Sequence, residues 1–253
     1  MQPNTLRWQT ANTSSTQPTI QVRPPRPRTA GSIVVSPPGF DDMGSILQNL
    51  GFSVLQTPDE SAFSIALPSS RIAFLNCGGA HPGPIIIQGI KKCLQGGGVV
   101  FASDWAADCL DALAVQGLQF HPRGGASTVV DAELVDQELR AAMGRDRVEL
   151  TFDLGGWIPV KTLPGCARVL LRGDVDLAGF LSGQARSQRV PLAFSVPLEA
   201  GQIFFTSFHN HAQITDLERG LLSFLAIKTI ATATGQTMRQ VITERRLTER
   251  LRL

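Results

Sequence analysis

Short apolar runs alternate with longer amphipathic segments through the first half of the chain. The runs at 32–36 (SIVVS) and 99–103 (VVFAS) are rich in β-branched or small apolar residues, which is typical of strands buried on both faces of a sheet. Between them, 43–51 and 84–98 carry apolar residues at helical spacing and end in glycine. This alternation predicts an α/β fold, a flavodoxin-like three-layer sandwich with a mostly parallel central sheet.

The second half is less regular. Segment 132–144 has the spacing of a helix, with Leu134, Leu139 and Met143 on its expected inner face. Two strand-like runs joined at LEAG predict a hairpin over 191–208. The following segment, 216–233, is apolar nearly all round, which predicts a buried helix.

Composition divides the chain into three parts. Residues 1–31 are rich in Pro, Ser, Thr and Gln and predict a flexible arm, because such residues bury too little apolar surface to offset the entropy of ordering. Residues 32–234 predict the α/β domain. Residues 235–253 are arginine-rich and predict a basic C-terminal helix or a solvated tail.

The chain of 253 residues, 43% hydrophobic with a net charge of +2, has the composition of an ordinary globular protein. That charge makes nucleic acid an improbable partner, and no apolar run approaches the roughly 20 residues of a membrane helix. The N-terminus lacks the apolar core of a signal peptide, so we expect a cytoplasmic protein. The four cysteines form no CxxC pair, which argues against a structural zinc site built on them: Cys77, Cys93, Cys109 and Cys166.

Functional residues of parallel sheets gather where the strands end, next to helix N-termini. That rule selects 76–83, 103–105 and 208–218 in this chain. The polar and glycine residues there that we expect to contact a ligand are Asn76, Gly78, Gly79, His81, Asp104 and Trp105.

Three blocks carry a resemblance to a known superfamily. IAFLNCGGAHPG is similar to the strand and Gly-Gly loop that supply oxyanion contacts in class I glutamine amidotransferase-like proteins. GGGVVFASDWAADCL resembles their strand, nucleophile elbow and helix, and GQIFFTSFHNHAQITDLERGLLSFL resembles their histidine-bearing strand and the helix after it. The hairpin PLAFSVPLEAGQIFFTSFHNH is similar to the ThuA-like branch of the superfamily.

The resemblance implies catalytic candidates. It places Ser103 where those enzymes carry the reactive cysteine, His209 at the catalytic histidine, and His211 at the glutamate position. An elbow needs small residues two positions before and after the nucleophile, and around Ser103 these are Phe101 and Trp105. With the cysteine replaced and the flanks large, we expect no glutaminase activity.

Ser103 has a second interpretation. SDWAAD is a good N-cap signal, in which the side chain of Ser103 or Asp104 accepts hydrogen bonds from free helix N–H groups. A serine nucleophile would instead need His209 as its base, with an acid such as Asp104, Asp216 or Glu218 to orient that histidine.

The histidines of HNH also have more than one interpretation. Alternate residues of an extended segment face the same side, so His209 and His211 are able to join His81 around a divalent metal such as zinc, with Asp104 adding a carboxylate. The alternatives are a polar cleft for a small ligand or peptide, and histidines that only satisfy carbonyl groups at a buried strand end.

The sequence therefore predicts a binding module for an unidentified protein or small molecule, with a degenerate active site and no cofactor. The alternative is a hydrolase that uses Ser103 and His209, or a metal held by His81, His209 and His211. Homo-oligomerisation stays open.

Overall fold

The computed structural model describes residues 32–124, 127–153, 155–177, 187–209 and 215–251. The predicted arm, 1–31, lies outside the described residues. None of the described helices combines the length and apolar character needed to cross a bilayer.

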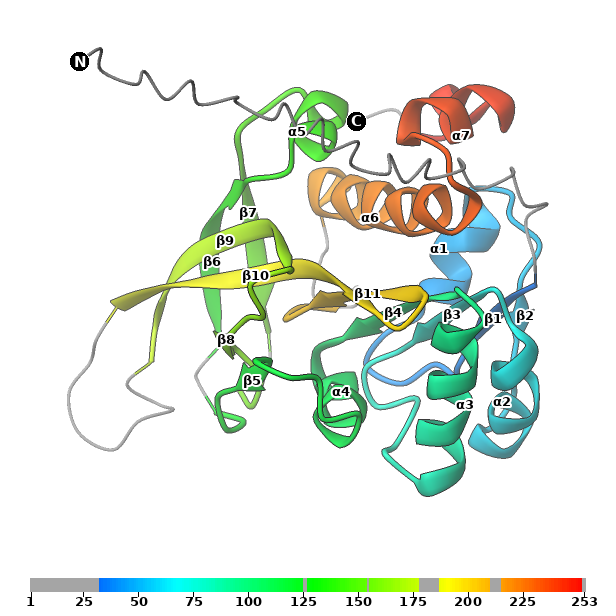
Figure 1. Cartoon of the computed structure of the whole chain (residues 1–253). Helices are drawn as coiled ribbons and strands as arrows, with labels where there is room; N and C mark the ends of the chain where they lie inside the picture. Colours follow the sequence, from blue (N-terminus) through cyan, green and yellow to red (C-terminus); the bar gives the residue numbers. More distant parts are fainter. Residues whose placement is uncertain (1–31, 125–126, 154, 178–186, 210–214, 252–253) are drawn as a thin grey trace, which may run out of the picture.

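Within the described residues, nine strands form one sheet in the order β2-β1-β3-β4-β11-β10-β9-β6-β7 (Figure 1). The first five are parallel to one another. Their bounds are β2 Leu55–Gln56, β1 Ile33–Val35, β3 Ile72–Leu75, β4 Val99–Ser103 and β11 Gly201–Thr206.

The rest of the sheet is an antiparallel extension that begins with the predicted hairpin of β10 and β11. Its strands are β10 Ser187–Leu198, β9 Arg168–Asp176, β6 Thr128–Leu134 and β7 Arg147–Phe152. A separate two-stranded sheet pairs β5 Gln119–Phe120 with β8 Val160–Thr162.

Helices cover both faces of the large sheet, which confirms the predicted flavodoxin-like sandwich (Figure 1). One layer holds α1 Met43–Asn49, α5 Gln137–Met143, α6 Asp216–Thr234 and α7 Met238–Glu244. The other holds α2 Glu60–Ala66, α3 Pro84–Gln95 and α4 Ala107–Ala112. Short 3-10 helices are also present among the described residues: η1 Leu67–Ser69, η2 Asp104–Ala106 and η4 Leu247–Glu249.

The two layers follow from the period of two along each strand. In β4, Phe101 packs with the α1–α6 layer and Ala102 with the α3–α4 layer. Neighbouring β3 repeats the pattern with Phe74 and Leu75. The buried helix α6 begins at a capping box in which Thr215 and Glu218 satisfy each other's backbone N–H groups.

The predicted helix at 132–144 is wrong in its first part. Residues up to Leu134 belong to β6, where Val130, Ala132 and Leu134 are buried at a period of two. The helix α5 begins only after Asp136, whose carboxylate accepts from the N–H of Leu139 at 3.0 Å.

At the C-terminal end, α7 and η4 lie against the domain. Met238, Val241 and Leu247 are buried in the same core as α1 and α6. The described part of the basic segment contains the helix α7 and the 3-10 helix η4, which pack on the core through these three residues.

Candidate functional site

The carboxyl ends of β3, β4 and β11 lie side by side, because these strands are neighbours in the parallel half of the sheet. Phe74 pairs with Phe101, and Leu75 with Ala102. Two residues further along this register, Cys77 lies next to the end of β4. The segments that the strand-end rule selected, 76–83, 103–105 and the described residues 208–209, therefore lie at one edge of the sheet.

The backbone turns sharply after β4, at Asp104. Ser103 is still extended, with φ −118° and ψ 134°, whereas Asp104 has a φ of 42°. A positive φ is costly for a residue with a side chain and marks the strained point of a turn. The residues two before and two after Asp104 are Ala102 and Ala106, both fully buried. The small flanks expected of an elbow therefore surround Asp104 and not Ser103.

Ser103 is fixed by contacts on the protein side of this turn. Its hydroxyl donates to the carboxylate of Asp41 and accepts from the N–H of Cys77 at 3.0 Å. It stands at the N-cap of η2 but makes no side-chain capping bond. Neither the predicted capping bond nor a bond from its hydroxyl to His209 is present among the contacts of Ser103 in the described structure.

Asp104 is buried and uses both carboxylate oxygens. Oδ1 accepts from the N–H of Ile158 at 2.9 Å. Oδ2 lies 3.4 Å from Nδ1 of His209 and 3.6 Å from the sulfur of Cys77. Only 3% of the side chain is exposed. The elbow residue is therefore a carboxylate enclosed by the protein.

His209 lies between two carboxylates, with Nδ1 facing Asp104 and Nε2 3.4 Å from Oδ1 of Asp153. Burial acts to lower the pKa of His209, but the hydrogen bond and charge of Asp104, with Asp41 and Asp153 adding, raise it overall. Burial also raises the pKa of Asp104, an effect that His209 opposes. The carboxylate of Asp104 and the imidazole of His209 therefore interact directly inside the protein.

Cys77 completes the cluster. It is 1% exposed, and burial followed by the charge of Asp104 raises the pKa of its thiol. Among the described residues, Cys77, Asp104 and His209 form a group whose ligand-type atoms all lie within 4.8 Å of one another. Sequence reasoning placed His209 and Asp104 in the site but left out Cys77.

Three of the predicted ligand contacts, Asn76, Gly78 and Gly79, lie in the loop after β3 and pack closely against neighbouring backbone. The amide of Asn76 accepts from Met43 N–H at the start of α1 and donates to the carbonyl of Ser36 at 3.0 Å. Gly78 has a φ of 73°, and a Cβ at Gly79 would lie 1.9 Å from the carbonyl oxygen of Pro37. These residues hold the loop after β3 against the loop after β1.

The predicted metal ligands are not gathered as expected. The ring of His81 is 71% exposed and contacts Glu60 at 3.3 Å, so it takes no part in the buried cluster. His211 lies outside the described residues, and its predicted roles stay predictions. Of the two predicted histidine ligands that the structure describes, His209 lies at the elbow and His81 does not.

A ring-and-cation group flanks the elbow, which we call the aromatic rim: Phe40, Trp105 and Arg123. The Phe40 and Trp105 rings meet edge to face at 5.1 Å, and the guanidinium of Arg123 lies 4.6 Å from the Trp105 ring centre. The indole N–H donates to the carbonyl of Gly156 at 2.8 Å, which fixes the ring. Phe40 is 41% exposed, so the rim faces solvent.

Sequence reasoning also missed Asp41 and Asp153. Asp41 lies in the loop after β1 of the parallel half, where the strand-end rule applies, whereas Asp153 follows β7, an antiparallel strand at the far end of the sheet. In the folded structure Asp41 contacts Ser103 and Asp153 contacts His209. The rule for parallel strands was therefore able to select Asp41 but not Asp153.

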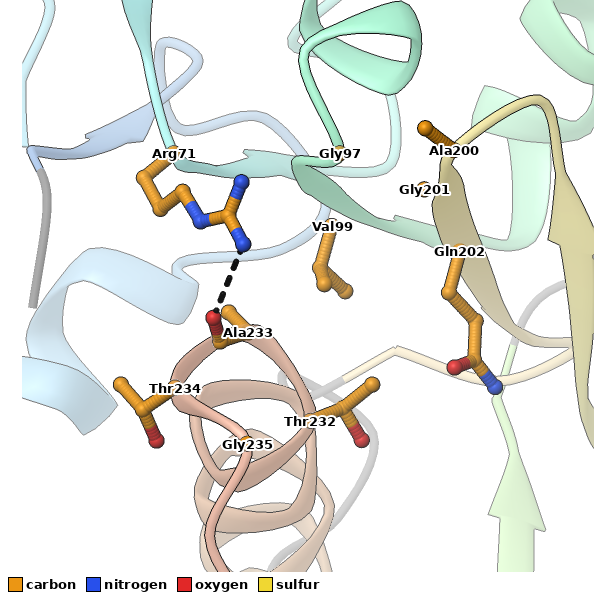
Figure 2. A pocket seen from close by; sticks show the side chains of 10 residues that line it. All are labelled: Arg71, Gly97, Val99, Ala200, Gly201, Gln202, Thr232, Ala233, Thr234 and Gly235. Atoms are coloured by element: carbon orange, nitrogen blue, oxygen red, sulfur yellow. Dashed lines mark hydrogen bonds between the residues drawn. The ribbon is translucent and has the colours of Figure 1, made fainter. Parts of the chain in front are cut away.

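A cavity of about 270 Å³ lies at the opposite edge of the sheet, beside the amino ends of β4 and β11 and the end of α6 (Figure 2). Figure 2 shows the side chain of Arg71 pointing to the carbonyl of Ala233. Nη2 donates to that oxygen at 3.2 Å, and Nη1 donates to the carbonyl oxygen of Gly96 at 3.0 Å. This arginine caps the last turn of α6, where a cation offsets the helix dipole. We therefore assign it a structural role and keep the elbow as the candidate site.

No protein family model matches the chain, and no curated protein matches it. Solved structures do. A ThuA-like protein from Bacteroides uniformis superimposes with a TM-score of 0.56 at 11% identity, covering 79% of this chain and 91% of that one. The mmIFT52 N-terminal domain gives 0.53 at 12% identity, covering 79% of this chain and 98% of that one.

A GMP synthase component from Thermoplasma acidophilum gives 0.53 at 11% identity, covering 86% of this chain and the whole of that one. At such identities the likeness shows the fold. The chain has the class I glutamine amidotransferase-like fold, close to ThuA-like proteins, which confirms the resemblance seen in the sequence.

Proposed function

We propose that this chain is a non-amidotransferase version of the fold, and that it works as a ligand- or protein-binding module with a degenerate active site. The observation that carries the proposal is Asp104 at the strained point of the turn after β4, flanked by Ala102 and Ala106. In this assignment Asp104, one residue later than Ser103, stands where an amidotransferase has its cysteine.

The chemistry of the elbow supports this function. Acyl transfer from glutamine needs a thiolate that reaches the substrate carbonyl carbon. The carboxylate of Asp104 instead has Oδ1 bonded to Ile158 and Oδ2 facing His209, and its side chain is 3% exposed. A buried carboxylate whose two oxygens both contact the protein is suited to stabilising the turn and poorly suited to attacking a substrate.

The hydrolase alternative based on Ser103 gains no support from the geometry. A serine nucleophile needs its proton taken by a histidine within about 2.6–3.2 Å. Here the hydroxyl donates to Asp41 and accepts from Cys77, and the residue lies within the extended end of β4. A fluorophosphonate probe should therefore leave the protein unlabelled.

We place the binding surface at the aromatic rim. Ring faces next to a guanidinium suit a partner that combines an apolar face with an anionic group. Arg123 contacts the exposed carboxylate of Asp108 and the Trp105 ring. Because an exposed ion pair is weak, a ligand anion is able to compete for this arginine.

The test combines an activity assay with a ligand screen. Purified protein should release no ammonia from glutamine. In thermal-shift and calorimetric titrations against saccharides, dicarboxylates and acidic peptides, a compound that binds should raise the melting temperature of the wild type, and the effect should vanish in Trp105→Ala and Arg123→Ala.

Arg172→Ala is the matched control, because Arg172 is an exposed arginine of β9 on the antiparallel extension. It should bind like the wild type. Turnover of glutamine or of an ester substrate that disappears in Asp104→Asn would contradict the proposal, as would binding unaffected by either rim variant.

A further inference from the structure

We propose that Cys77, Asp104 and His209 form a binding site for a divalent transition-metal ion, with zinc as the ion their chemistry suits best. The three side chains come from the ends of β3, β4 and β11, and each is less than a tenth exposed. A thiolate, an imidazole and a carboxylate are the ligand types that zinc takes in proteins. This site shares only His209 with the set of histidines that the sequence suggested.

The distances match a tetrahedral ion. With zinc–oxygen and zinc–nitrogen bonds of about 2.05 Å and a zinc–sulfur bond of about 2.3 Å, a tetrahedron has O···N edges of about 3.3 Å and O···S edges of about 3.6 Å. The structure has Oδ2 of Asp104 3.4 Å from Nδ1 of His209 and 3.6 Å from Sγ of Cys77. The two separations that involve Asp104 therefore match those around a zinc ion, and the ligand atoms of His209 and Cys77 lie within 4.8 Å of each other.

Groups around the ligands support the same assignment. A histidine that binds metal through one nitrogen usually donates its other N–H to a carboxylate, and Nε2 of His209 lies 3.4 Å from Asp153. A ligating carboxylate is usually hydrogen-bonded as well, and Oδ1 of Asp104 accepts from Ile158. The neighbouring Asp41 is fully buried and adds negative charge that favours a cation.

Binding would exchange protons for the ion. Zinc binds a cysteine as the thiolate and a histidine as the neutral imidazole, so the Cys77 thiol proton and any proton on the ligating nitrogen of His209 would leave to solvent. Three protein ligands leave one tetrahedral position for a water molecule or a small ligand. The inference goes beyond the proposed binding function, because the ion would stabilise the elbow whether or not the aromatic rim binds a partner.

The test is a cobalt titration of the chelator-stripped full chain. Co²⁺ bound to a thiolate gives a sulfur-to-metal charge-transfer band in the near ultraviolet, and tetrahedral Co²⁺ gives intense visible bands. We expect both to saturate at one equivalent and to be bleached by one equivalent of zinc. Zinc should also raise the melting temperature.

Variants locate the ion. Cys77→Ser should abolish the charge-transfer band, whereas Cys93→Ser and Cys166→Ser should retain it, since one is a buried and the other an exposed cysteine outside the cluster. Absence of the band in the wild type, or its persistence in Cys77→Ser, would overturn the proposal. Neither result depends on ligand binding at the rim, so the two proposals fail separately.

Asp153→Asn is a second test that does not change a buried side chain, for the case in which the Cys77 variant fails to fold. Its side chain is 40% exposed, so the substitution should leave the fold intact, yet the loss of this partner of His209 should weaken metal binding by about 10–100-fold. The control Asp131→Asn removes another exposed carboxylate, on β6, and should bind cobalt like the wild type. Equal affinities for Asp153→Asn and the wild type would overturn the assignment.

Discussion

The pair of Asp104 and His209 should be strongly coupled in the metal-free protein. Both side chains are less than a tenth exposed, and the two facing atoms are 3.4 Å apart. At that distance, unit charges in a medium of dielectric about 20 attract by about 5 kcal/mol, which is an upper limit because the site relaxes when a partner is removed. We therefore expect a coupling free energy of about 2–3 kcal/mol.

The assay is a double-mutant cycle in urea with a chelator present. Asp104→Asn keeps the acceptor for the N–H of Ile158 and removes the charge, and His209→Gln keeps a polar side chain of similar reach. Each single variant should lower the free energy of unfolding by about 3–5 kcal/mol, because it leaves the other partner buried without its counter-charge. The double variant should lose less than the sum.

An exposed ion pair provides the reference. Arg172 and Glu133 pair across β9 and β6 on the solvent side of the sheet, with side chains 44% and 23% exposed. Solvent screens such a pair, so its cycle should give a much smaller coupling. A coupling between Asp104 and His209 no larger than this reference would refute the reasoning, since it would mean that the buried pair carries no opposite charges.

Three further outcomes follow from single sites. Gly79→Ala should lower the free energy of unfolding in urea by about 1–3 kcal/mol, because the new Cβ would lie 1.9 Å from a backbone carbonyl oxygen. The control Gly83→Ala places its Cβ in open space, with no atom within 4 Å, and should be near neutral. Ser103→Ala should cost about 1–3 kcal/mol, measured the same way, because buried Asp41 loses a hydrogen-bond donor; an unchanged midpoint would contradict this. Burial raises the pKa of the Cys109 thiol from 9.0 to about 12, so its contribution to stability is present below pH 9 and is lost as pH rises toward 12. Between pH 8 and about 10.5 the wild type should therefore lose more stability than Cys109→Ala, and parallel losses would count against the shift.

The fold was accessible from the sequence because its parallel half consists of short continuous apolar runs. In β1, β3 and β4 every residue is buried, which leaves a signal that needs no partner to interpret. The end of β6 was harder to predict. There, Ala132 and Leu134 fit both a strand and a helix, and only pairing with β7 and β9 decides for the strand.

The strand-end rule selected the edge of the sheet that holds the candidate site, whereas the strained residue of the turn is Asp104, one residue after Ser103. Sequence alone does not give a backbone angle, and Ser103 and Asp104 are both good residues to precede a helix. One signal was readable: Ala102 and Ala106 flank Asp104 at the spacing an elbow needs, whereas the large Phe101 and Trp105 flank Ser103. The aspartate was therefore the residue with elbow-like neighbours.

Cys77 shows why the sequence did not predict the whole cluster. It lies after a different strand from the elbow, and the parallel pairing of β3 with β4 brings it to Asp104. A rule based on CxxC spacing searches for ligands close in sequence, whereas neighbouring strand ends supply ligands far apart in sequence. The contact of Cys77 with Asp104, at 3.6 Å, is a property of strand order.

The cycle and the cobalt titration together distinguish two explanations of the buried cluster. If Asp104 and His209 interact only with each other and bind no ion, the cycle should give the same coupling with zinc as with chelator. If zinc binds the cluster, both singles lose the ion as well as the partner, and the apparent coupling should grow with zinc concentration, because a ligand that binds only the folded state adds its own binding free energy to the wild type. Cys77→Ser should remove that growth and leave the chelator value unchanged, since the thiol contributes to the ion and only weakly to the pair.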